Sequence, residues 1–260
     1  MNAPRVSGAV APTQFYPPVS AKWTARKDRR PAPQPRIVPY TRRFEIKWIN
    51  DQGVIEDIIR VAPAIPEIEA GFNAFTHGAL ISTSEGPVAV EDLEPGMMIE
   101  TANSGAVPLR WIGAMTLIPG APARDGADDH LYRVITDAFG LGRPAHDVTL
   151  GPGARFLDRS PETRAQFGTD AALAPISGFA DGASVVQITP VAPVKVFHLS
   201  FDAHHIVNAN GVEVESFHPG PETAAALDET MRAQLMSLFP HKERLQDFGR
   251  MLWPRQSQEI

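Results

Sequence analysis

Short apolar runs separated by turn-forming residues dominate the middle of the chain. Eleven such runs lie between residues 79 and 216, and each is bounded by Gly, Pro, Asn or Asp. Short strands at this spacing indicate an all-β body rather than repeated βαβ units. We expect strands at residues 79–83, 88–90, 97–101, 107–117, 131–136, 147–150, 154–157, 184–189, 194–201, 205–208 and 212–216.

The residues before this region predict a hairpin and a connector. Apolar and polar residues alternate over 44–48, residues 51–53 supply a turn, and 54–61 is a second apolar run. This is the pattern of a β-hairpin. The prolines of segment 62–73 disfavour a helix, so we expect an extended connector there.

Helical patterns close the chain. From Pro221, apolar residues follow at three-to-four spacing, with acids in the early turns; a second short run spans 243–253. We expect these apolar stripes to pack on the parent core rather than on a partner or a membrane. A brief helix is also expected within 161–173. The first stripe consists of Leu227, Met231, Leu235 and Leu238.

The charge is unevenly distributed. Residues 1–43 contain nine Lys or Arg, one acid and eight prolines, which gives this segment a net charge of +8 in a chain of net charge -6. Such a segment has little to bury against the entropy of ordering, so we expect a disordered, Pro-rich basic tail. Its possible partners are another protein or an anionic surface, such as nucleic acid or a membrane.

Composition sets further bounds. Of the 260 residues, 43% are hydrophobic, enough for a sizeable core. No window approaches 18 consecutive apolar residues and no secretory signal is recognisable, so we expect no transmembrane segment and a cytoplasmic location. The chain has no cysteine, which excludes disulfides, thiolate metal sites and thiol nucleophiles. We expect neither a cofactor nor a metal.

Three blocks resemble the Hint (Hedgehog/intein) self-processing family, especially its bacterial variants outside true inteins. They are AFTHGALISTSEGPVAVEDLEPGMMIET at 74–101, PLRWIG at 108–113 and FHLSFDAHHIVNANGVEVESFHPG at 197–220. The resemblance implies an all-β Hint-type fold. In the family, a Cys or Ser at the opening position attacks the preceding carbonyl, and a histidine in a middle segment assists as general acid-base catalyst.

The resemblance also implies that this chemistry is missing. Ala74 stands at the nucleophile position, and a methyl group cannot attack a carbonyl. The middle segment 149–157 resembles a family segment of Ser-Pro-x-His-Arg, which puts Gly151 at the hydroxyl position and Ala154 at the histidine position. Losing either group costs orders of magnitude in rate, so the site is expected to be degenerate and the chain is not expected to be an enzyme.

Residual routes to cleavage stay open. Thr76 shares the strand face of Ala74 but lies about 7 Å further along. His204 resembles the late-block histidine and, with Asp202, would form an oriented acid-base pair; His204 and His205 should point to opposite faces. Asn210-Gly211 reads as a hairpin turn rather than a cleavage pair. A metal site would need three or four convergent ligands, for which His198, Asp202, His204 and His218 are the candidates; residues 198, 202 and 204 share one face if the strand is unbroken.

These features predict four regions and three competing functions. The regions are a tail at 1–43, a hairpin and connector at 44–69, a Hint-like domain at 70–220 and a helical extension at 221–260. The first hypothesis is a degenerate self-processing module retained as a scaffold or binding unit. The alternatives are residual autoproteolysis through Thr76 or a His204-centred site, and binding to an anionic surface or nucleic acid through the basic tail.

Overall fold

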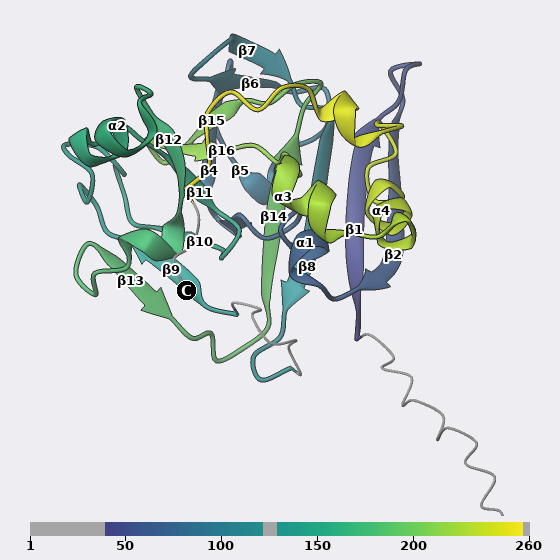
Figure 1. Cartoon of the computed structure of the whole chain (residues 1–260), viewed down its shortest axis with the longest axis horizontal. Coiled ribbons are helices and arrows are strands. Elements are labelled where there is room, and N and C mark those ends of the chain that lie inside the picture. The colour runs from purple at the N-terminus through teal and green to yellow at the C-terminus, as the bar shows by residue number, and fades with distance from the viewer. Residues whose placement is uncertain (1–39, 122–128, 257–260) are drawn as a thin grey trace, which may run out of the picture. The chain divides into compact units, whose positions relative to one another are not determined.

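Two antiparallel β-sheets form the body of the protein (Figure 1). The computed structural model describes residues 40–121 and 129–256. The first sheet has the strand order β13-β9-β10-β3-β14-β8-β1-β2. Its strands are β1 (Thr41–Ile49), β2 (Ile55–Pro63), β3 (Phe75–Thr76), β8 (Trp111–Leu117), β9 (Leu131–Val134), β10 (Val148–Leu150), β13 (Val185–Ile188) and β14 (Val194–Ser200).

The second sheet has the order β12-β11-β16-β15-β4-β6-β7, with β5 paired to β4. Its strands are β4 (Leu80–Thr83), β5 (Gly86–Ala89), β6 (Met98–Thr101), β7 (Gly105–Pro108), β11 (Arg155–Asp158), β12 (Ala172–Pro175), β15 (Ile206–Ala209) and β16 (Val212–Glu215). Strand pairing therefore dominates the described residues, and the predicted all-β fold with C-terminal helices is confirmed.

Helices are few and short. Within the described residues they are α1 (Pro66–Glu69), α2 (Pro161–Phe167), α3 (Gly220–Ala226) and α4 (Glu229–Met236), with 3-10 turns at Val90–Asp92, Ile176–Phe179 and Leu245–Phe248. In residues 40–121 and 129–256, no helix has the length and apolar character needed to span a bilayer.

One hydrophobic core joins the two sheets. It contains Phe75, Leu150 and Leu199 from the first sheet, together with Ile81 and Val207 from the second. All five side chains are fully buried. Alternation along the strands places these side chains on inward faces, so their burial holds the sheets together. Ala74 and Ala154 belong to this core.

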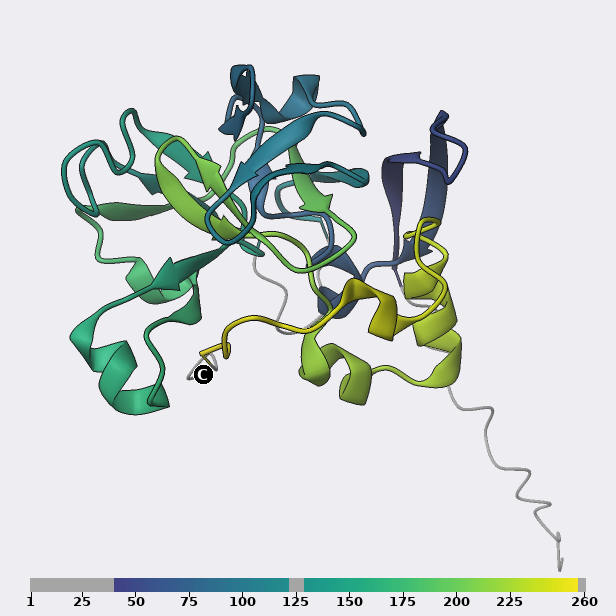
Figure 2. The same cartoon turned by 90° about the horizontal axis from the view of Figure 1, so that it is seen from above.

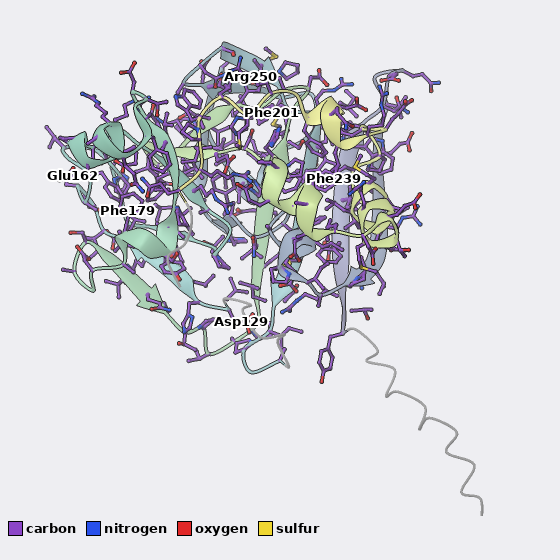
Figure 3. All side chains as sticks on the ribbon, viewed as in Figure 1. Asp129, Glu162, Phe179, Phe201, Phe239 and Arg250 are labelled. Carbon is purple, nitrogen blue, oxygen red and sulfur yellow. The ribbon has the colours of Figure 1, made fainter. Side chains whose placement is uncertain are left out.

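A second core joins the N-terminal hairpin to the C-terminal helices. Trp111 stacks on Phe239 at 4.4 Å between ring centroids, and its indole Nε1 donates a hydrogen bond of 2.9 Å to the Leu238 carbonyl. Leu227, Leu235 and Leu238 are buried here, so the predicted packing of the apolar stripe is confirmed, with Met231 partly buried. Figure 3 shows Phe239 on one side of the body and Phe179, which packs on the first core, on the other.

Both predicted hairpin turns are present. Strands β1 and β2 pair over their whole lengths, and β1 continues the first sheet by pairing with β8 from Phe44–Met115 to Trp48–Trp111. Asn210 and Gly211, with φ of 53° and 92°, turn β15 into β16. Positive φ at both central positions is the signature of a type I′ hairpin turn, which explains the Asn-Gly pair.

Several predicted boundaries were wrong. The connector 62–73 contains α1, because Pro66 occupies the first turn, where its missing N–H costs nothing. The run 107–117 is two strands, β7 and β8. The helix expected from 221 breaks at Leu227, since the Asp228 side chain caps α4 by accepting from the Met231 N–H at 2.7 Å.

The remaining differences from the predicted elements lie near the two ends of the described chain. Only the turn Leu245–Phe248 is helical within 243–253. Strand β1 starts at Thr41, inside the expected tail. The rest of that tail, residues 1–39, and its predicted disorder lie outside the described residues. After the turn at 245–248, the chain runs back toward β12, as the yellow segment in Figure 2 shows. We call residues 249–256 the C-terminal strap.

Candidate functional site

Ala74, Gly151 and Ala154, the three positions that the resemblance aligns with the family's catalytic groups, meet in the structure. The Gly151 N–H donates a hydrogen bond of 2.9 Å to the Ala74 carbonyl, and the Ala154 N–H donates one of 3.1 Å to the Gly151 carbonyl. Ala74 and Ala154 are fully buried. The folded chain therefore brings Ala74, Gly151 and Ala154 together, and none of the three carries a polar side chain.

The backbone around Asn73 is packed against glycines. A Cβ atom on Gly151 would lie 2.0 Å from the Asn73 carbonyl oxygen, and one on Gly153 would lie 2.0 Å from Asn73 Oδ1. The Gly153 N–H donates to the Asn73 carbonyl at 3.1 Å. This carbonyl precedes Ala74, so it is the group that a family nucleophile would attack. The Gly153 N–H can polarise this carbonyl, and the methyl side chain of Ala74 beside it cannot attack it.

Thr76 is the nearest hydroxyl along the chain. It lies on β3, is 5% exposed, and its Oγ1 donates a hydrogen bond of 2.8 Å to the Thr149 carbonyl. A peptide carbonyl is not a general base that could remove the hydroxyl proton. Thr76 in this arrangement has no activating partner for nucleophilic attack.

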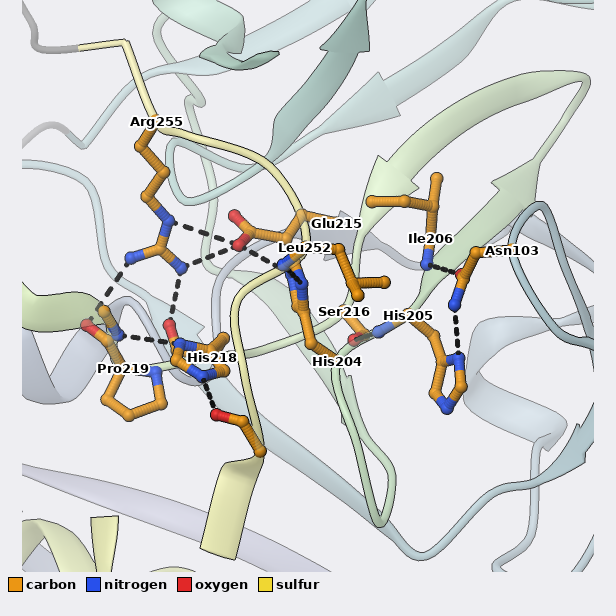
Figure 4. A network of polar contacts seen from close by, with 12 residues as sticks. Asn103, His204, His205, Ile206, Glu215, Ser216, His218, Pro219, Leu252 and Arg255 are labelled. Atoms are coloured by element: carbon orange, nitrogen blue, oxygen red, sulfur yellow. Dashed lines mark hydrogen bonds and ion pairs between the residues drawn. The ribbon is translucent and has the colours of Figure 1, made fainter. Parts of the chain in front are cut away.

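His204 is fixed at both ring nitrogens (Figure 4). The Leu252 N–H donates to Nδ1 at 3.1 Å, so Nδ1 carries no proton. Nε2 is therefore the protonated nitrogen and donates to Glu215 Oε1 at 3.0 Å. The imidazole is neutral and both of its nitrogens are occupied. The adjacent His205 contacts Asn103 instead, at 3.0 Å.

The predicted Asp202–His204 pair was wrong. Asp202 forms an ion pair with Arg110 at 3.1 Å, and its side chain is 72% exposed. The reason lies in the backbone: β14 ends at Ser200 and β15 begins at Ile206, so no continuous strand carries the two residues on one face. The acidic partner of His204 is Glu215.

The buried carboxylate of Glu215 forms hydrogen bonds with two side chains, Arg255 and His204. Arg255 donates to its Oε1 from Nη2 at 2.8 Å and from Nε at 3.2 Å, while His204 bonds the same oxygen. Burial raises the pKa of Glu215, but the Arg255 charge and the His204 hydrogen bond outweigh it and bring that pKa to about 2. At neutral pH this group is ionised and cannot donate a proton.

Arg255 ties the C-terminal strap to the late motif. Its Nη2 also donates to the His218 carbonyl at 2.6 Å. Two backbone hydrogen bonds join the strap to β12: the Leu173 N–H donates to the Pro254 carbonyl at 2.8 Å, and the Gln256 N–H donates to the Leu173 carbonyl at 2.9 Å. The strap thus packs over His204 and Glu215 and holds them in place.

The other buried histidines are also neutral. Burial lowers the pKa of His198 to about 3, and the Leu199 N–H donates to its Nδ1 at 3.0 Å. His218 accepts from the Gly220 N–H at Nδ1 and donates from Nε2 to the Gly249 carbonyl. Across residues 40–121 and 129–256, no three His, Cys, Asp or Glu side chains cluster as metal ligands.

Two members of this network were not predicted as site residues. Glu215 lies in the block 197–220 that resembles the family, which was a signal that it belongs near the site. Arg255 carried no signal, because it lies 40 residues further along the chain and no spacing rule connects it to Glu215.

Comparison with known proteins identifies one family. The model of the Hint domain family matches residues 73–221. A bacterial intein-like domain from Clostridium thermocellum is 13% identical, with 56% of this chain and 99% of that chain covered at a TM-score of 0.38. A DnaB intein from Synechocystis is 18% identical, with 56% and 99% covered at a TM-score of 0.31. No curated protein sequence matches the chain.

Proposed function

Because this chain belongs to the Hint domain family, we propose that it is a degenerate self-processing module, retained as a binding or scaffolding unit. One observation carries the proposal. Ala74, Gly151 and Ala154, which the resemblance aligns with the family's catalytic groups, lie together and are linked by backbone hydrogen bonds, and their side chains offer no nucleophile, base or acid. The domain therefore keeps the Hint fold but lacks a side chain at position 74 that could attack the carbonyl of residue 73 and begin self-processing.

The closed late block supports the same proposal. Glu215 is held by Arg255 and His204, and the strap crosses this pair. Self-processing needs groups that change protonation state or partner during the reaction. Here the carboxylate is ionised, the imidazole is neutral, and both are locked by hydrogen bonds, which suits a structural role.

Residual autoproteolysis is the competing hypothesis. It requires Thr76 or a His204-centred site to act, and it would produce fragments of the chain. Purified full-length protein should be incubated at acidic, neutral and alkaline pH, and its intact mass should be followed over days. We expect a single species. Accumulation of fragments that Thr76→Ala or His204→Ala abolishes would refute the proposal, whereas fragments unaffected by either variant point to contaminating protease.

The basic tail favours a second function. A net charge of +8 over residues 1–43 suits an anionic partner such as nucleic acid. Because β1 begins at Thr41, a truncation should stop at residue 39 to spare the hairpin. We expect the full chain to bind an unrelated DNA duplex with an affinity that falls steeply with salt, and the truncated chain to lose that binding. Equal binding by both chains would eliminate the tail as the binding element.

The regional boundaries at residues 44, 70 and 221, the bacterial variant and the cytoplasmic location stay predictions.

A further inference from the structure

Arg155 is a charged side chain without a partner. It opens β11, directly after Ala154, and it makes no hydrogen bond or ion pair with the described residues. Its Nε is buried. A guanidinium stays protonated in proteins, so a positive charge remains here whatever the surroundings. An enclosed, uncompensated charge is costly, and proteins generally supply a counter-charge.

Arg155 lines a small cavity. The cavity has a volume of about 40 Å³, and its wall also includes His198, Glu215, His218, Thr223 and Arg255. A single water needs about 10–15 Å³ of such space, so the cavity accommodates one or a few water-sized species. It is too small for a nucleotide or a peptide, which limits the ligand to a small ion or water.

No acidic side chain among the described residues pairs directly with Arg155. Glu215 is the acidic group in its wall, and Arg255 already takes that charge through two hydrogen bonds. Glu222, on α3, is exposed and forms no hydrogen bond or ion pair with Arg155 in the described residues. Burial, the largest effect, lowers the pKa of Arg155 and the nearby Arg255 lowers it further, whereas Glu215 and Glu222 raise it from a distance. Neither carboxylate forms an ion pair with Arg155 among the described residues, and the lowered pKa means that its surroundings as a whole disfavour the charge.

The cavity wall also has hydrogen-bond donors without acceptors. His198 accepts from the Leu199 N–H at Nδ1, so its own proton is on Nε2, which forms no hydrogen bond with the described residues. Arg155 Nε is likewise unpaired. Donors that lie beside a guanidinium with no contacting counter-charge fit a ligand that only accepts hydrogen bonds.

We propose that this cavity binds one small monovalent anion of about the size of chloride, held by Arg155 and by the Nε2–H of His198. The anion neutralises the Arg155 charge and accepts the free hydrogen bonds. It also binds between β11, β14 and α3, so it stabilises the closed arrangement in which the strap covers the late block. The site is independent of the cleavage chemistry that Ala74 has lost.

Stability measurements test the proposal. The urea midpoint should be measured as chloride replaces gluconate at constant ionic strength, because gluconate is too large for the cavity. Binding to the folded state alone makes the wild-type midpoint rise and then level off with chloride. Arg155→Met should lose at least about tenfold in chloride affinity, as expected for removal of a charged hydrogen bond. Arg155→Lys should retain part of the response.

The matched control is Arg164→Met. Arg164 is an exposed arginine on α2 whose side chain makes no hydrogen bond in the described residues, so its loss removes an equal charge far from a cavity. It should respond to chloride as the wild type does. The same chloride response in wild type, Arg155→Met and Arg164→Met would overturn the proposal, since the effect would then be general screening.

Bromide provides a second test that needs no variant. Crystals of the wild-type chain soaked in bromide should show an anomalous peak beside Arg155 and His198. A peak there supports the site even if Arg155→Met does not fold. An empty cavity, or one that contains water alone, refutes it.

Discussion

Restoring a hydroxyl at the family's middle position should destabilise the protein. In Gly151→Ser, the new Cβ would lie 2.0 Å from the Asn73 carbonyl oxygen and 2.8 Å from its carbon. Ordinary contact begins at 3.4 Å, so one of the two backbone segments must move by about 1.4 Å, the difference between those distances. Displacing the carbonyl of residue 73 is costly, because it accepts a hydrogen bond from the Gly153 N–H. It also adjoins Ala74, whose N–H and carbonyl both form backbone hydrogen bonds.

The cost follows from these contacts. Overpacking typically destabilises by about 1–3 kcal/mol, and each backbone hydrogen bond that the shift weakens contributes about 0.5–1.5 kcal/mol. We expect Gly151→Ser to lower the free energy of unfolding by about 3 kcal/mol. Equilibrium urea unfolding measures this as a lower midpoint at an unchanged slope.

Gly178→Ser is the matched control. A Cβ at Gly178 meets nothing within 4 Å, and this exposed glycine does not need the left-handed region. We expect its free energy of unfolding to stay within about 0.5 kcal/mol of wild type. If Gly151→Ser proved as stable as Gly178→Ser, the claim that the hydroxyl position has closed would be wrong.

Three further predictions concern the buried groups and the C-terminal helices. Glu215→Gln should cost about 3–5 kcal/mol in urea unfolding, because Arg255 loses its counter-charge inside the protein; a loss below about 1 kcal/mol contradicts a buried pair. Burial lowers the pKa of His198 and His241 from 6.5 to about 3. Their contribution to the free energy of unfolding is therefore complete above pH 6.5 and declines as the pH falls toward 3. NMR titration should find both rings neutral at pH 5, and protonation of either ring near pH 6.5 would contradict this prediction. Leu235→Ala should cost about 2–5 kcal/mol because Leu235 is fully buried, whereas Leu252→Ala, at 46% exposure, should cost far less; equal costs would show that the helices do not share the core.

The strands were predictable because their signals are local. Alternation over 44–48 and the Asn210-Gly211 pair each reflect the backbone conformation of a few adjacent residues, and the structure contains both hairpins. The apolar stripe through Leu235 was likewise visible, since a 3.6-residue period survives a break in the helix. Pattern and fold agree where the determinants lie close in sequence.

The missed elements depend on single residues or on distant partners. Asp228 caps α4 and so divides one expected helix into two, a choice that the apolar period does not reveal. Strand β12 was missed because 172–175 forms a strand only against β11. The short helix α1 begins at Pro66, a residue that was taken as evidence against a helix.

The same contrast between local signals and distant partners applies to the candidate site. Motif resemblance brought out Ala74, Gly151 and Ala154, and the fold brings them together. The predicted acidic partner of His204, Asp202, was wrong, because the chain between β14 and β15 leaves the strand conformation. Arg255 could not be found from sequence. Arg155 follows Ala154 at the arginine of the Ser-Pro-x-His-Arg segment, but its lack of a partner becomes visible only when its neighbours are known.

Trapping an acyl intermediate would examine the loss of self-processing without waiting for slow hydrolysis. The wild-type chain should be incubated with excess hydroxylamine at neutral pH, which cleaves any ester formed at the residue 73 carbonyl; a thioester cannot form, because the chain has no cysteine. Intact-mass spectrometry and N-terminal sequencing then report any new terminus. We predict an unchanged chain of 260 residues. A fragment that begins at Ala74 would contradict this account.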